Sequence, residues 1–172
     1  MTEEYSLADL VEITGAKPRT LQVWAERGVI QPIKSTAHAG TGVHRLFSRK
    51  EAIVACIIHP FASHQIGIGE LHLISGVLRS HLLIQAFFGA VEKAIGSVGD
   101  TLLTVYSQHR ESGRPSYRMS VRGAAVVREM DTTGELFGGY SGGYPIIDLP
   151  KLRAPGVVII TIRLETYLAK LK

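Results

Sequence analysis

Residues 5–48 read YSLADLVEITGAKPRTLQVWAERGVIQPIKSTAHAGTGVHRLFS, and this stretch decides the fold of the first part of the chain. Apolar residues at helical spacing begin at Leu7 and predict a helix that ends at Gly15, because glycine readily adopts the left-handed conformation that terminates helices. A second helix is predicted from Pro18, which is tolerated at the first helical position, to Gly28. Two short helices joined by a tight turn are typical of a helix-turn-helix motif.

The second predicted helix has two faces of different polarity. Leu21 and Trp24 lie three residues apart and predict an apolar face. The remaining surface and the N-terminal end carry polar and basic residues, namely Lys17, Arg19, Thr20, Gln22 and Arg27. Arginine and lysine pair with guanine edges or phosphates, glutamine with adenine, and threonine with either. An ordinary amphipathic surface helix would also turn basic residues outward, but the Gly-x-Gly turn at 40–42 and Arg45 favour DNA binding.

Residues 5–79 resemble the winged helix-turn-helix of the MerR family of transcription regulators. The recognition helix of that family reads roughly T-L-R-[YF]-[YW]-E-x-x-G-[LI]-[LI]-x-P, and residues 20–32 read TLQVWAERGVIQP. The wing of the family ends in G-x-R-x-[YF]-S-x-x-[DE], and residues 42–51 read GVHRLFSRKE, with the arginine one residue later. Gln22 replaces the usual arginine, and Ala25 replaces the usual acid.

The resemblance implies a homodimer that binds double-stranded DNA. Residues 18–27 would enter the major groove, and the wing at 40–47 would lie along the adjacent backbone or minor groove. RNA polymerase or another protein is a possible further partner. The residues expected to contact DNA are Lys17, Pro18, Arg19, Thr20, Gln22, Val23, Arg27, Thr41, His44, Arg45 and Phe47.

A largely helical segment is predicted after the wing. Ser48 is a good N-cap, and Glu51 has the spacing of its capping-box partner. His59-Pro60 is expected to disturb that helix. Residues 70–95 form a long apolar segment that would span roughly 40 Å as one helix at about 1.5 Å per residue. In the family such a helix pairs with its mate, which predicts a dimer seam of Leu71, Ile74, Leu78, Leu82, Phe87 and Val91. The alternative is a helix pair within a monomer core, broken near Gly76 or Gly89.

After Gly96 the apolar periodicity changes to two, which predicts strands. The predicted strands cover residues 101–107, 117–122, 124–130, 145–148 and 157–161, with the last in a central position because it is continuously apolar. A helical turn at 150–153, a loop at 138–145 and a closing helix at 163–171 complete the pattern. The fold class is therefore α+β, with a small C-terminal α+β domain whose sheet is mainly antiparallel. The expected division is 1–69 for DNA binding, 70–96 for dimerisation or linkage, and 97–172 of unknown role.

Composition sets the broad class of the protein. The 172 residues are 45% apolar and 20% charged, enough for a folded core, and the formal net charge of +4 suits a polyanionic partner. The acidic N-terminus and the lack of a long apolar run predict no signal peptide and no membrane span, hence a cytoplasmic protein. A single cysteine rules out an internal disulfide and fits that compartment.

Enzymatic and metal chemistry are not predicted. Residues 139–143 read GYSGG and match Gly-x-Ser-x-Gly, but no apolar strand precedes them as a nucleophile elbow requires. Cys56 lies on an apolar helical face and is expected to be a small buried hydrophobe. His59, His64, His72 and His81 lack the spacing of three or four that places two ligands on one helical face. Neither an enzyme, a cofactor nor a metal site is therefore expected.

Two other functions stay open. The same winged fold serves recombination-directionality factors, which bend DNA and recruit an integrase. The chain could also be a protein-interaction module that uses its C-terminal domain.

Overall fold

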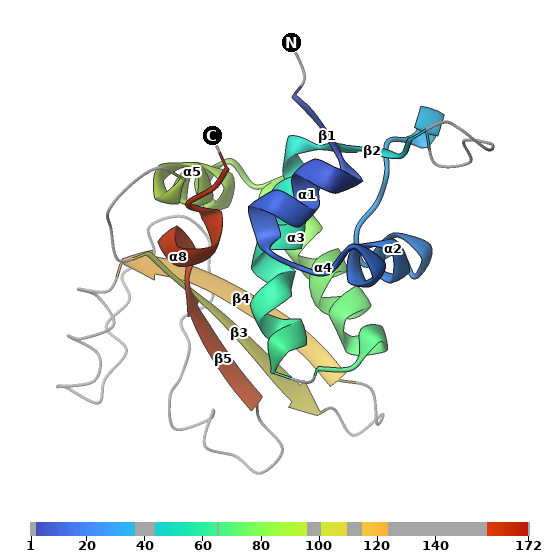
Figure 1. Ribbon diagram of the computed structural model, residues 1–172. Coiled ribbons are helices and arrows are strands. Elements are labelled where there is room, and N and C mark those ends of the chain that lie inside the picture. Colours follow the sequence, from blue (N-terminus) through green and yellow to red (C-terminus); the bar gives the residue numbers. More distant parts are fainter. Residues whose placement is uncertain are drawn as a thin grey trace, which may run out of the picture.

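The computed structural model describes residues 3–36, 44–64, 66–95, 101–109, 115–123 and 158–171. It is an α+β protein in which helices cover a three-stranded sheet (Figure 1). Helix α2 and the short strands β1 and β2 lie on the side of the helices away from that sheet (Figure 1).

Helices α1 (Leu7–Thr14) and α2 (Pro18–Glu26) form the predicted helix-turn-helix. Ser6 and Asp9 make a capping box at the start of α1, because each accepts a hydrogen bond from the other's backbone N–H. Gly15 ends α1 with φ at 73°, in the left-handed region. Gly28, with φ at 72°, forms the turn after α2. Both helix ends therefore lie where the two glycines predict them.

Strands β1 (Glu4–Ser6) and β2 (Leu46–Ser48) pair antiparallel and form a two-stranded ribbon. The pairing of Tyr5 with Phe47 places the start of the chain beside the residues that follow the wing. A 3-10 turn, η1 (Lys34–Thr36), follows α2.

Helix α3 (Arg49–Ser63) begins at the predicted N-cap, Ser48, whose side chain accepts a hydrogen bond from the Glu51 N–H. The expected disturbance at His59-Pro60 is wrong, because α3 continues through a buried Pro60 to Ser63. Eight successive residues of this helix, 51–58, are buried. A helix covered on all sides tolerates the proline because packing holds it in place.

The single long helix expected at 70–95 is wrong. Helix α4 (Ile68–Leu82) and helix α5 (Gln85–Ala94) are separated at Leu83-Ile84, and their axes differ in direction by about 101°. The break lies at neither Gly76 nor Gly89, which are both inside helices. His81 lies at this corner, with its Nδ1 2.9 Å from the Val77 carbonyl and its ring edge against Phe87.

Strands β3 (Thr101–His109), β4 (Pro115–Gly123) and β5 (Val158–Arg163) form an antiparallel sheet in the order β4-β3-β5. In the register, Thr104 pairs with Ser120 on one side and with Thr161 on the other. Among the described strands β3 is central and β5 is at the edge, so the central position expected for the last strand is not observed. The predictions for 124–130, 138–145, 145–148 and 150–153 lie outside the described residues.

Helix α8 (Leu164–Leu168) is shorter than the closing helix expected at 163–171, and it packs against α3. One hydrophobic cluster extends from Leu10 to Leu171. It includes buried residues of the helix-turn-helix head, which comprises the elements from β1 to α3, and buried residues of the C-terminal sheet. The division into three domains remains a prediction. Residues of all three segments contribute to the same hydrophobic cluster. No single helix among the described residues could cross a membrane, and only the bent α4–α5 pair has the required length and composition.

Candidate nucleic-acid interface

Helix α2 presents its cations to solvent. Leu21 and Trp24 are at most 2% exposed and hold the helix against the core. Lys17, Arg19 and Arg27 are exposed, and Pro18 occupies the first turn. None of these three cations forms an ion pair within the part of the chain that the structure describes. Their charges are therefore accessible to an anionic partner.

Three further predicted contact residues lie between the exposed and the buried face of α2. Thr20, Gln22 and Val23 are each partly buried. Lys17, at the N-cap, makes no side-chain capping bond. The first backbone N–H groups of a helix have no partner within the helix, so this end attracts negative charge.

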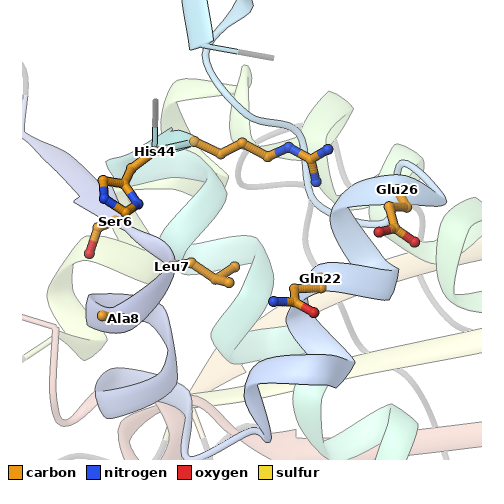
Figure 2. A pocket seen from close by; sticks show the side chains of 7 residues that line it. Ser6, Leu7, Ala8, Gln22, Glu26 and His44 are labelled. Atoms are coloured by element: carbon orange, nitrogen blue, oxygen red, sulfur yellow. The ribbon is translucent and has the colours of Figure 1, made fainter. Parts of the chain in front are cut away.

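A hollow of about 600 Å³ separates α2 from the base of the wing. Figure 2 shows Gln22 and Glu26 of α2 on one side and His44 on the other, with Ser6, Leu7 and Ala8 at the start of α1. Arg45 also lines this hollow. The structure therefore brings together Gln22 of the recognition helix with His44 and Arg45 of the wing. Thr41, at the predicted wing tip, lies outside the described residues.

Phe47 is not available for DNA contact. The structure buries it completely in the core, where it pairs across the β1–β2 ribbon with Tyr5. Its aromatic ring belongs to the support of the wing, because a side chain with no exposed surface cannot reach a ligand. The prediction that Phe47 contacts DNA is therefore wrong.

The six residues expected at the dimer seam are also buried within one chain. None of them is more than 2% exposed, and all belong to the same cluster as the helix-turn-helix core: Leu71, Ile74, Leu78, Leu82, Phe87 and Val91. The apolar face that would need covering in an isolated long helix is covered here by the fold of the chain itself. The alternative, a helix pair in a monomer core, describes these residues.

Arg49 fixes the ribbon at the base of the wing. Its guanidinium forms ion pairs with Glu3 at 2.7 Å and with Glu92 of α5 at 3.2 Å. The hydrogen bond to Glu92 raises the pKa of Arg49 above its ordinary value, and the bond from Arg49 lowers the pKa of Glu3. Lys50, the next residue, places its Nζ 5.7 Å from the centre of the Phe88 ring. These contacts join the start of α3 to α5.

Cys56 is 1% exposed, as the sequence predicts. Burial raises the pKa of its thiol to about 12, so the thiol is protonated at neutral pH and is a poor nucleophile. Among the described residues no group of three or more histidine, cysteine, aspartate or glutamate side chains could hold a metal ion.

Two features of the site were not predicted from the sequence. Glu26 lines the hollow, and its spacing of four from Gln22 on the same helical face was the available signal. The ion pair between Arg79 and Glu51 contacts the segment that follows α2. A charged residue among the apolar positions of α4 was the only indication of that pair. Glu51 also forms half of the expected capping box, because its carboxylate accepts from Arg79 instead of from the backbone of Ser48.

The fold and its exposed basic helix define a helix-turn-helix protein. Residues 5–74 match the family described as MerR HTH family regulatory protein, so this segment is a MerR-family helix-turn-helix domain. A solved structure, a transcriptional regulator of the MerR family from Bacillus cereus, is 15% identical. The match covers 54% of this chain and 80% of that one, with a TM-score of 0.34. No curated protein matches the chain.

Proposed function

We propose that the chain is a sequence-specific, double-stranded DNA-binding transcription regulator. The observation that carries the proposal is that Gln22 of α2 and Arg45 at the base of the wing line one hollow. A recognition helix and a wing that face the same side can contact one DNA duplex together. The regulatory family matched by residues 5–74 supports this function.

Each side chain has a role that follows from its chemistry. Arg19 and Gln22 read base edges in the major groove, since arginine pairs with guanine and glutamine with adenine. Lys17, Arg27 and Arg45 contact phosphates and hold the protein in register. Glu26, beside Gln22, accepts a hydrogen bond from a cytosine amino group at a neighbouring base pair.

We infer that the regulator acts in the cytoplasm as a homodimer on two half-sites, because helix-turn-helix proteins that read palindromic sites do so in pairs. The interface must lie outside the six core residues of α4 and α5 discussed above. Sedimentation of the full chain at several concentrations measures the assembly. RNA polymerase or another protein is a possible further partner of such a regulator.

The test begins with selection of duplexes by the wild-type chain from a pool with a random centre of about 20 base pairs, two helical turns. Arg19→Ala and Gln22→Ala should each cost about 1–3 kcal/mol on the selected duplex and relax the preference at one base pair. Unchanged affinity in both variants, with the fold intact, would assign recognition to another helix.

The wing requires a separate variant. Arg45→Ala should weaken binding to all sequences and lower the salt slope by about one unit, as the loss of one phosphate contact does. Lys93→Ala, which removes an exposed cation on α5, is the matched control for net charge and should leave affinity unchanged. An effect of Arg45→Ala at one base position only would make Arg45 a reader of sequence.

A reporter assay then distinguishes regulation from architecture. A regulator changes transcription from a promoter that carries the selected site. A recombination-directionality factor would instead change the frequency of excision and leave the reporter unaffected.

A further inference from the structure

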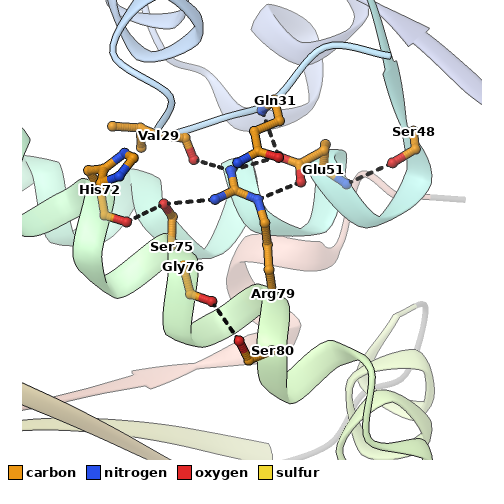
Figure 3. A network of polar contacts seen from close by, with 9 residues as sticks. All are labelled: Val29, Gln31, Ser48, Glu51, His72, Ser75, Gly76, Arg79 and Ser80. Carbon is orange, nitrogen blue, oxygen red and sulfur yellow. Dashed lines mark hydrogen bonds and ion pairs between the residues drawn. The ribbon is translucent and has the colours of Figure 1, made fainter. Parts of the chain in front are cut away.

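Arg79 of α4 and Glu51 of α3 form an ion pair beside Val29 and Gln31, in the segment that follows the recognition helix (Figure 3). The Nε atom of Arg79 donates to one carboxylate oxygen at 2.7 Å, and Nη2 donates to the other at 3.0 Å. The two side chains are only 19% and 11% exposed. Two parallel hydrogen bonds of this kind fix both the distance and the relative orientation of the partners.

Both partners of this pair also hold the segment that leaves α2. Nη2 of Arg79 donates to the Val29 carbonyl at 2.6 Å. The backbone N–H of Gln31 donates to the carboxylate of Glu51 at 2.8 Å. Ile30, between them, is completely buried. The segment that follows the recognition helix is therefore fixed at Val29 and at Gln31, on either side of the buried Ile30.

The same segment continues into the base of the wing. The N–H of Ile33 donates to the Leu46 carbonyl of β2 at 2.7 Å, and the N–H of Leu46 donates to the Thr36 hydroxyl at 3.0 Å. Glu51 itself lies three residues after the last residue of β2. Arg79 and Glu51 thus connect the end of α2 to the start of the helix that follows the wing.

Helix α4 supports this arrangement over two turns. The Ser75 hydroxyl accepts from Nη1 of Arg79 at 3.2 Å and donates to the His72 carbonyl at 2.8 Å. The ring of His72 packs against Gly28, where an added Cβ would lie 3.2 Å from its Cε1. Gly28 forms the turn that ends α2, so α4 contacts the exit of that helix at both Gly28 and Val29.

The ion pair between Arg79 and Glu51 is not explained well by its contribution to the stability of the fold. Moving two charges out of water is costly, and a well-packed apolar replacement of similar volume is often equally stable. Its directional bonds, in contrast, fix backbone positions that an apolar contact would leave free to slide. We propose that Arg79 and Glu51 are positioning residues for DNA recognition, which set the distance and angle between α2 and the wing without touching DNA. The proposal rests on the proposed function.

The binding test uses the full chain and two probes, the duplex selected by the wild type and a scrambled duplex of equal length. Arg79→Met should weaken binding to the selected duplex at least tenfold and change binding to the scrambled duplex less than threefold. Glu51→Gln should act in the same direction. Glu165→Gln is the control, because the Glu165 carboxylate is also buried and also accepts from a backbone N–H, that of Thr101 in the C-terminal sheet. It should change neither affinity.

A distance measurement tests the geometry without DNA. Spin labels at Arg19→Cys and His44→Cys report on α2 and the wing base, and the single native cysteine, Cys56, is buried. Arg79→Met should broaden the distribution of label distances, whereas Glu165→Gln should leave it as narrow as in the wild type. An unchanged distribution in Arg79→Met overturns the proposal.

The outcomes separate this inference from the proposed function. Wild-type affinity of folded Arg79→Met for the selected duplex overturns the positioning role and leaves DNA binding intact. A wild-type chain that selects no duplex overturns both. If Arg79→Met does not fold, Arg79→Lys replaces it, since a lysine keeps the charge but lacks the planar fork that reaches Glu51 and Val29 together. Wild-type affinity and distances in Arg79→Lys overturn the proposal as well.

Discussion

The helix-turn-helix head and the C-terminal sheet are built by different kinds of contact. In the head, short-range signals define each element: the Ser6–Asp9 capping box starts α1, and Gly15 and Gly28 end helices. In the sheet, β3 pairs with β5 across more than 50 residues of sequence. Both nevertheless contribute to one hydrophobic cluster. Because the head and the sheet contribute to one hydrophobic core, we expect them to unfold together in one cooperative transition. The following variants test this expectation.

The largest effect is expected at Leu78, which is completely buried. Leu78→Glu places a charge in the shared core and should cost about 4–5 kcal/mol, which approaches the whole stability of a marginal domain. Urea denaturation and sedimentation measure the result. Leu73→Glu, on the same helix at 46% exposure, is the matched control and should change stability by less than about 0.5 kcal/mol. A folded, monomeric Leu78→Glu would instead support an interface between chains.

Leu168 tests the link between the two regions, because it belongs to α8 and packs in the common core. Leu168→Ala should lower the free energy of unfolding by about 3 kcal/mol, within the range for a buried leucine. Trp24, the only tryptophan, reports on the head by fluorescence, and circular dichroism reports on the whole chain. Both transitions should shift together. A tryptophan transition that does not move would show that the head unfolds independently.

Two glycines, one in the turn after α2 and one inside α4, give effects of opposite sign. Gly28→Ala should destabilise by about 1–2 kcal/mol, because a residue with φ at 72° is strained once it carries a Cβ and the His72 ring lies 3.2 Å away. Gly76→Ala, inside α4 with open space around it, should stabilise by about 1 kcal/mol. Chemical denaturation of the pair measures both. If Gly28→Ala instead changed the free energy of unfolding by the same amount as Gly76→Ala, the backbone of the turn after α2 would be able to adopt another conformation without strain.

The smallest effect concerns pH. Burial lowers the pKa of His59 below its ordinary 6.5, and its ring lies 6.4 Å from that of Trp24. The unfolded chain therefore binds this proton more readily, so the free energy of unfolding falls as the pH drops below about 6.5 and levels off below the folded pKa. His59→Gln should remove this part of the pH dependence. The exposed His64→Gln is the control and should preserve it.

Local sequence signals predict some elements of this fold, whereas tertiary packing decides others. The bounds of α1 and α2, the N-cap of α3 and the antiparallel sheet could be predicted, because capping residues, glycines and alternation act locally. The bend after Leu82 could not, since no proline or glycine marks it and the surrounding core decides it. Pro60 was misleading for the same reason, because tertiary packing lets α3 continue through it to Ser63.

The candidate site shows the same limit. The cations of α2 and Arg45 are predicted to contact DNA because a known motif surrounds them. Phe47 matched the motif equally well, yet its position marks a buried support and not a contact. The Arg79–Glu51 pair joins residues 28 positions apart, and no local pattern indicates which carboxylate an isolated arginine will meet.

The position of α8 against α3 has a consequence for synthesis of the protein. The Lys170 Nζ donates to the Glu12 carbonyl at 3.1 Å, and Leu164, Leu168 and Leu171 fill the core beside α3. About 100 residues separate α3 from α8, and ribosomes add about 5–20 residues per second. For roughly 5–20 seconds the nascent head therefore exposes the apolar surface that α8 later covers. A chaperone that binds such surfaces would occupy the chain in this interval, until α8 has docked against α3.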